Sequence, residues 1–129
     1  MQVQKLDHVN LRSANLETLV EWYTDVLGMR KGERPPFSFP GAWMYAGDHA
    51  AVHLVGVDEQ PSGGEPTLEH FALTATGLSD FIERLNQKGV EYWARRVPGF
   101  GILQINISDP DGNHIHIDFT SEEADAAGM

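Results

Sequence analysis

The stretch LDHVNLRSANL, residues 6–16, recurs 62 residues later as LEHFALTATGL, residues 68–78. The two copies share three leucines and one histidine, and an acidic residue precedes the histidine in each copy. The matching positions are Leu6, His8, Leu11 and Leu16 in the first copy and Leu68, His70, Leu73 and Leu78 in the second. Because the offset is close to half of the 129 residues, the sequence predicts two copies of one structural unit.

The pattern within each copy predicts the element order β-α-β-β-β. Alternating apolar residues predict strands over 5–11 and 68–75, and apolar residues at helical spacing predict helices over 16–27 and from Leu78 to Gly89. The other expected strands are 29–34, 42–46, 50–57, 90–95, 102–107 and 114–119. The predicted fold class is therefore α+β, built as a tandem of two such units.

The two units are expected to form a single domain spanning residues 1–129. They occupy about 4–57 and 67–120, joined by the polar linker 58–66, and the acidic tail 121–129 is expected to fray. Units of this size are marginal alone, so they should share a core or pair with a second chain.

The net charge of −10 argues against nucleic acid or an anionic membrane surface as a main partner and leaves a small-molecule substrate. The absence of cysteine excludes disulfides and thiolate metal sites and favours the reducing cytoplasm. No apolar run reaches the length of a membrane span, and the N-terminus lacks the apolar core of a secretion signal. A cytoplasmic location is therefore expected.

Four of the six histidines occupy matching places in the two units. His8 and His70 lie on the first expected strand of each unit, and His53 and His116 lie on the last. A lone histidine on a strand usually packs or faces solvent, but packing does not require histidine at equivalent positions of both halves. If a pseudo-two-fold axis relates the units, the four rings converge on one divalent cation. His49 is expected in a solvent-facing turn.

The tandem unit, the opening LDHVNLRSANLETLVEWYTDVLGM and the ending DPDGNHIHIDF resemble the vicinal oxygen chelate superfamily. This group includes glyoxalase I, methylmalonyl-CoA epimerase, extradiol dioxygenases, and fosfomycin- and bleomycin-resistance proteins. The resemblance covers about residues 4–120 and implies curved mixed sheets around a metal cleft. It assigns the metal ligands to His8, His53, His70 and His116, the last in a position where the family usually has glutamate.

The missing glutamate removes one negative charge and the residue that acts as base in glyoxalase I-like relatives. An all-histidine site shifts the metal preference away from magnesium and towards zinc, nickel, cobalt, iron or copper. The expected cofactor is a divalent metal ion, with zinc, nickel, cobalt, iron and manganese as the candidates. The predicted catalytic residues are Asp118 and His114, which lie on the same face of the last strand as His116. A metal-bound hydroxide is the third candidate for the base. Asp118 is alternatively expected to orient a ligand, and His114 to line the pocket or support a ligand.

Aromatic and basic side chains are candidates for the pocket walls, a lid and the anchors of an anionic group. For each of them, core packing or a solvated surface charge is the alternative. The candidates are Trp43 and Tyr45 for the walls, Phe37, Phe39 and Phe100 for the lid, and Arg34, Arg95 and Arg96 for the anchors.

The resemblance implies a metal-dependent glyoxalase-like lyase or isomerase, whose substrate is a small carbonyl compound or its thiol adduct that chelates the metal through vicinal oxygens. One alternative is an Fe(II) extradiol-type dioxygenase. Another is a non-catalytic drug-binding resistance protein, whose cationic drugs suit the acidic chain. The resemblance further implies a homodimer, with the metal site either within one chain or across two.

Overall fold

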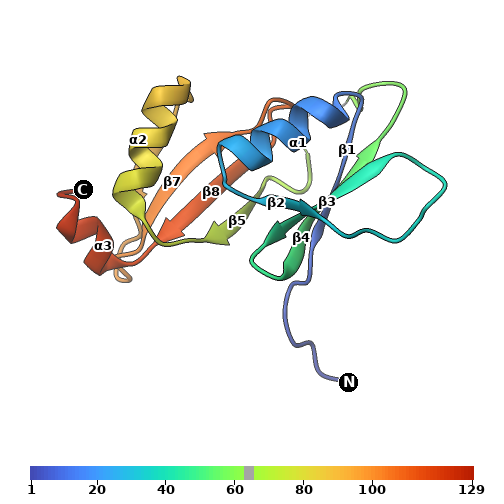
Figure 1. Ribbon diagram of the computed structural model, residues 1–129. Helices are drawn as coiled ribbons and strands as arrows, with labels where there is room; N and C mark the ends of the chain where they lie inside the picture. Colours follow the sequence, from blue (N-terminus) through green and yellow to red (C-terminus); the bar gives the residue numbers. More distant parts are fainter. Residues whose placement is uncertain (63–65) are drawn as a thin grey trace. The chain divides into compact units, whose positions relative to one another are not determined.

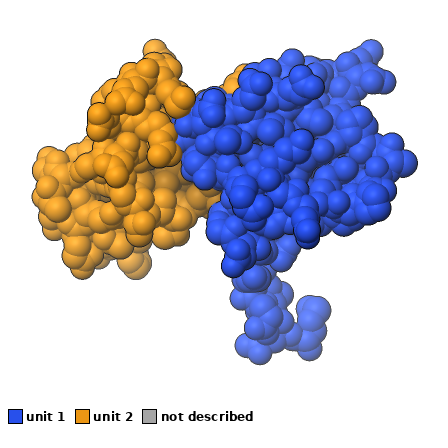
Figure 2. Space-filling view, in the orientation of Figure 1, with its two compact units in different colours: residues 1–64 blue, residues 65–129 orange. Residues whose placement is uncertain are grey.

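The computed structural model describes residues 1–62 and 66–129. The chain divides into two compact units, Met1–Gly64 and Glu65–Met129, coloured separately in Figure 2. Of the predicted linker 58–66, residues 58–62 contain no helix or strand, and 63–65 lie outside the described residues. Among the described residues, no helix has the length and apolar character needed to cross a membrane.

The first unit contains a four-stranded mixed sheet and one helix (Figure 1). Its elements are β1 (Val9–Ser13), α1 (Leu16–Asp25), β2 (Arg30–Gly32), β3 (Gly41–Ala46) and β4 (His49–Gly56). The strand order is β1-β4-β3-β2, with β1 parallel to β4 and the other neighbours antiparallel. Helix α1 contacts β2, β3 and β4, so it covers one face of this sheet.

The second unit repeats this arrangement. Its elements are β5 (His70–Thr74), α2 (Leu78–Lys88), β6 (Trp93–Arg96), β7 (Leu103–Ser108), β8 (His114–Phe119) and α3 (Ser121–Ala126). The strand order is β5-β8-β7-β6, with β5 parallel to β8 and the others antiparallel. The tandem β-α-β-β-β prediction is therefore confirmed, and α3 is an addition to it.

The strand registers show that the duplication extends to single residues. In the first unit Asn10 pairs with His53, and in the second Ala72, at the equivalent position, pairs with His116. Each of these partners lies two residues after the histidine of its repeat. Because side chains alternate along a strand, the early and late histidines of each unit point to the same face of their sheet.

The opposite face of each sheet is the hydrophobic core of its unit. In the first unit α1 contributes Leu19 and Tyr23, which pack above buried residues of the central strands. In the second unit, rings of α2 and β8 meet, with 5.9 Å between the centroids of Phe81 and Phe119. The buried apolar strand residues are Leu11, Ala42, Met44, Val52 and Leu54 in the first unit and Phe71, Leu103, Ile105, Ile107, Ile115, Ile117 and Phe119 in the second. The histidines lie between these core positions, on the face away from the core.

The two first strands begin later than their apolar pattern indicates. Pairing starts at Val9 in β1 and at His70 in β5, whereas the predicted strands began at residues 5 and 68. Leu6 and Leu68 remain 76% and 59% exposed. These repeated leucines therefore gain little burial within their own units, and the alternation there does not correspond to strand pairing.

The expectation that the acidic tail frays is wrong, because residues 121–126 form helix α3. Thr120 caps it, and its side chain accepts a hydrogen bond from the Glu123 amide. Ala124 is fully buried. Glu123 also reaches α2, since its carboxylate accepts a bond of 2.7 Å from the Gly77 amide. The N-cap of α2 is Gly77.

The turn before β8 depends on Asp109, which is 4% exposed. Its carboxylate accepts bonds from the Asp111 amide (3.0 Å), the Asn113 amide (2.9 Å) and the Asn113 side chain (2.8 Å). We expect Asp109→Ala to lower the free energy of unfolding by about 2–3 kcal/mol, because it leaves three part-buried donors without their acceptor. Urea denaturation measures this.

The control is Asp58→Ala, an exposed carboxylate outside the helices and strands. It should change the free energy of unfolding by no more than about 0.5 kcal/mol. Equal unfolding midpoints for the two variants would show that the Asp109 bonds do not stabilise this turn.

Candidate metal and ligand site

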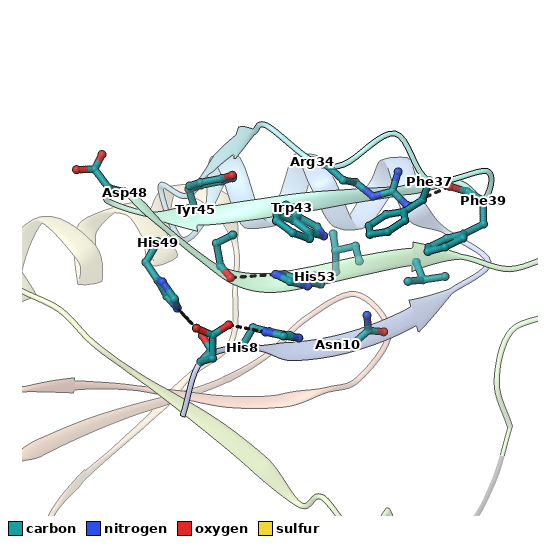
Figure 3. Close-up of a pocket in the computed structure, with 14 residues that line it drawn as sticks. His8, Asn10, Arg34, Phe37, Phe39, Trp43, Tyr45, Asp48, His49 and His53 are labelled. Carbon is teal, nitrogen blue, oxygen red and sulfur yellow. Dashed lines mark hydrogen bonds and ion pairs between the residues drawn. The ribbon is translucent and has the colours of Figure 1, made fainter. Parts of the chain in front are cut away.

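In the first unit, two of the predicted ligands stack on each other. The rings of His8 and His53 are parallel, with centroids 3.8 Å apart and 10° between the planes. Trp43 of β3 stacks on the same His53 ring at 4.0 Å and 12°. Figure 3 shows the three rings side by side, each from a neighbouring stretch of the sheet. Because lone pairs of imidazole nitrogens lie in the ring plane, these two histidines would bind one cation only after one ring rotates.

Hydrogen bonds determine which nitrogen each of these rings offers. Nδ1 of His8 donates to Oδ2 of Asp7 at 2.7 Å, which leaves Nε2 as the free acceptor. Nε2 of His53 donates to the Ala50 carbonyl at 3.1 Å, which leaves Nδ1. Burial lowers the pKa of His53 below its ordinary value, and the neighbouring His8 charge lowers it further. A neutral imidazole retains the lone pair that a metal ligand needs.

Asp7 joins two histidines of the first unit. The hydrogen bond from His8, with a further contribution from the charge of His49, holds the pKa of Asp7 below its ordinary value. His49 was expected in a turn, but it is the first residue of β4, and its Nε2 donates to the Asp7 carbonyl. The segment before β1 is therefore attached to β4 by side chains that flank the His8 ring.

In the second unit, three histidines share one face of the sheet. His114 and His116 are alternate residues of β8, as predicted, and His70 faces them from β5. The ring centroid of His70 is 4.7 Å from that of His116 and 5.3 Å from that of His114. None of these three rings is stacked in parallel with another, in contrast to the pair in the first unit.

Glu69 bridges two of these rings. Its Oε2 accepts a hydrogen bond from Nδ1 of His70, and its Oε1 accepts one of 2.9 Å from Nδ1 of His114. These bonds, that of His70 first, hold the pKa of the Glu69 carboxyl below its ordinary value. One ligand atom from each of Glu69, His70 and His114 lies within 4.8 Å of the others, close enough for the three to hold a metal ion.

Glu69 is absent from the ligand set predicted from the sequence, although the sequence contains a signal for it. The acidic residue before the histidine in each repeat is Asp7 in one copy and Glu69 in the other. Each of these carboxylates accepts a hydrogen bond from the ring of the histidine that follows it. The repetition of the acid, like that of the histidine, indicates a shared role in orienting the ring.

Asp118 contacts His116, as expected if Asp118 orients a ligand. Its Oδ1 accepts a bond of 2.6 Å from Nδ1 of His116, so Nε2 of this ring is left as acceptor. His116 is 7% exposed. His114 is held at both nitrogens, since its Nε2 lies 2.9 Å from Oδ1 of Asn106. Both predicted catalytic residues thus lie beside the histidines of the second unit.

A cavity of about 590 Å³ opens on the histidine face of the first unit (Figure 3). His8, His53 and the Trp43 ring lie along its length. Five of the predicted wall, lid and anchor residues line it: Arg34, Phe37, Phe39, Trp43 and Tyr45. Tyr45 is oriented by its hydroxyl, which donates to the Glu33 carbonyl at 2.6 Å.

The remaining predicted anchors lie in the second unit and have other surroundings. Arg96 donates to the Asp125 carboxylate at 2.6 Å and to the Gly101 carbonyl at 2.9 Å, and it also contacts the Met129 carbonyl. The Arg96 guanidinium thereby attaches the C-terminal helix, so its role is structural. Arg95 and Phe100 are exposed, and Phe100 is not among the residues that line the described cavity.

Residues 5–117 match the family described as the Glyoxalase/Bleomycin resistance protein/Dioxygenase superfamily. The chain belongs to this superfamily, which confirms the resemblance inferred from its opening and ending motifs.

Curated and solved relatives agree with this assignment. The chain is 31% identical to a lactoylglutathione lyase of Escherichia coli O157:H7, over 95% of each chain. It is 30% identical to biphenyl-2,3-diol 1,2-dioxygenase 3 of Rhodococcus globerulus, over 88% of this chain and 62% of the relative. A crystal structure of a glyoxalase family protein from Bacillus anthracis matches with a TM-score of 0.75 and 20% identity, over 92% of this chain and 96% of that one.

Proposed function

We propose that this protein is a metal-dependent glyoxalase-like lyase or isomerase that acts on a small carbonyl compound or its thiol adduct. The similarity to lactoylglutathione lyases at about a third of positions supports the reaction class. We propose that His8, His53, His70 and His116 hold one divalent metal ion. A bound divalent metal polarises a substrate carbonyl and stabilises the negative charge that develops on its oxygen.

The carboxylate bonds to three of the four histidine rings are the observation that carries this proposal. Nδ1 of His8, His70 and His116 each donates to a carboxylate, of Asp7, Glu69 and Asp118 respectively. Carboxylate bonds of this kind fix the tautomer and the ring orientation of metal-binding histidines and leave Nε2 as the ligand atom. Structural packing alone does not require the same carboxylate arrangement on three rings, so the residues fit a metal site.

Proton transfer in this proposal is assigned to Asp118 or His114. Asp118 uses Oδ1 to hold His116, and Oδ2 forms no hydrogen bond with the described residues, so it is available to accept a proton. His114 is linked through Glu69 to His70. The proton from a substrate carbon next to a carbonyl would pass to Oδ2 of Asp118, or to His114 once one of its two hydrogen bonds has broken. It would then return to the neighbouring carbon in an isomerisation.

Elemental analysis of the purified protein and an assay with hemithioacetal test this function together. Protein stripped with a chelator should be inactive, and activity should return with zinc, nickel, cobalt, iron or manganese. The proposal is wrong if the purified protein binds none of these ions, or if metal-loaded protein has no turnover above the stripped protein.

A second function is favoured by one specific arrangement. Glu69, His70 and His114 supply one carboxylate and two imidazoles within 4.8 Å, the ligand types of non-haem Fe(II) oxygenases. The dioxygenase of Rhodococcus globerulus is also a relative at 30% identity. Oxygen uptake with catechols and Fe(II), lost in Glu69→Ala, would identify this activity. No oxygen uptake by the iron-loaded protein would exclude extradiol chemistry.

The homodimer and the alternative function as a drug-binding protein stay predictions, and each can be tested directly. Size-exclusion chromatography with light scattering gives the mass in solution, and a monomer would contradict the dimer. Saturable binding of a cationic glycopeptide by protein without turnover would support a resistance protein instead of an enzyme.

A further inference from the structure

Arg34 is a cation that lines the cavity of the first unit without a carboxylate partner among the described residues. Its Nη2 donates to the Phe39 carbonyl at 3.0 Å, and the guanidinium carbon lies 5.0 Å from the ring centroids of both Phe37 and Phe39. The chain has 19 acidic and 9 basic residues, so carboxylates that could pair with an arginine are plentiful. The guanidinium is therefore held by rings and one carbonyl, with its other N–H donors available.

The local backbone makes room for this guanidinium. A Cβ atom at Gly41 would lie 2.7 Å from Nη2 of Arg34 and 2.5 Å from the Leu54 carbonyl oxygen. Both distances are shorter than real Cβ contacts, so the glycine at the start of β3 permits the close approach of Arg34.

Flat aromatic surfaces flank Arg34 in the same cavity. The rings of Phe37 and Phe39 are stacked, with centroids 5.0 Å apart and 13° between the planes. The Phe37 ring lies 6.5 Å from that of Trp43, which continues the surface to the His53 ring. Phe37 and Phe39 are 46% and 43% exposed, so these rings present apolar area to a ligand.

The cavity has two electrostatically different ends. Figure 3 shows Arg34, Phe37 and Phe39 at one end and Asp48 with His49 at the other, with His53 between them. An anionic group is attracted to the arginine end and repelled from the acidic end. A guanidinium matches a carboxylate with two parallel hydrogen bonds, which gives this end its chemical preference.

We propose that this cavity binds small aromatic carboxylates, with the carboxylate on Arg34 and the ring against Phe37, Phe39 and Trp43. The bound molecule would extend from Arg34 toward His8 and His53, two of the proposed metal ligands. Its role as a substrate therefore rests on the proposed function. The binding step itself needs only residues of the first unit and no metal.

Calorimetric titration of the full chain, stripped with a chelator, tests this inference with 2-naphthoate as the probe. Its neutral isostere 2-naphthamide has the same rings without the charge. We expect saturable binding of the carboxylate and at least about tenfold weaker binding of the amide, since hydrogen bonds to a charged group contribute this much. Arg34→Gln should reduce the affinity for 2-naphthoate by a similar factor and leave the weak binding of 2-naphthamide unchanged.

Lys88→Gln is the matched control, because it removes one positive charge from an exposed position at the end of α2 in the second unit. It should alter the affinity by less than about twofold. No saturable binding of 2-naphthoate, equal affinities for the acid and the amide, or full affinity in Arg34→Gln would each overturn the inference. The titration contains no metal, so its outcome does not depend on whether a metal site exists. If 2-naphthoate does not bind, metal-dependent turnover of other substrates is still tested separately.

Discussion

His70→Ala is expected to reduce both divalent-metal affinity and metal-dependent turnover by more than about 100-fold, because loss of a ligand exceeds the effect of losing its supporting partner. His70 is central to the ring cluster of the second unit, with centroid distances of 4.7 Å to His116 and 5.3 Å to His114. Its carboxylate partner, Glu69, would then be left with His114 alone.

Metal content after dialysis and a competition titration with a coloured chelator measure the first effect, and initial rates with hemithioacetal measure the second. The control is His49→Ala, which removes a histidine that the metal proposal does not use. Retention of metal and activity in His70→Ala would remove this residue from the ligand set. Loss of both in His49→Ala as well would point to a general effect of histidine removal on the cavity.

Glu69→Gln has the second largest expected effect, a reduction of metal affinity by about 10–100-fold. The substitution keeps the size of the side chain but removes the charge that attracts protons of two imidazoles. Glutamine offers one acceptor oxygen, so it can no longer accept from His70 and His114 with two oxygens at once. The two rings would lose their common orientation.

A competition titration measures the affinity of Glu69→Gln directly, without reliance on activity. Glu59→Gln provides the matched control, since it makes the same chemical change at an exposed position before residues 63–65. Identical affinities for Glu69→Gln and the parent protein would mean that Glu69 neither orients nor ligates. A loss far beyond the expected range would instead favour direct ligation by Glu69, as in the iron arrangement.

Periodicity and repetition predict much of this fold because they act over short distances in the chain. The alternation in residues 114–119 predicted β8 with the correct bounds, since each second residue must enter the core. The repeat placed His53 and His116 at equivalent strand positions, which the registers of β4 and β8 confirm. Gly89 ended α2 as predicted, with a positive φ of 65°.

Local patterns failed where a distant partner decides the conformation. The acidic tail looked unable to fold by itself, yet Arg96 and Gly77 supply contacts from residues far away in the chain. The leucines at positions 6 and 68 fit a strand by alternation, but no neighbouring strand pairs with them within their units. Whether a segment pairs as a strand and becomes buried depends on the neighbouring strand as much as on its own sequence.

By itself, the sequence determined the tandem β-α-β-β-β plan and the faces on which the histidines lie, because these follow from a period and from a duplication. Its opening and ending motifs carried the resemblance to the superfamily. The tertiary structure alone decided which atoms meet: the His8–His53–Trp43 stack, Glu69 between His70 and His114, and Arg34 against the stacked rings of Phe37 and Phe39. These contacts depend on side-chain rotamers and on strands brought together from distant parts of the chain. No spacing rule along the sequence contains that information.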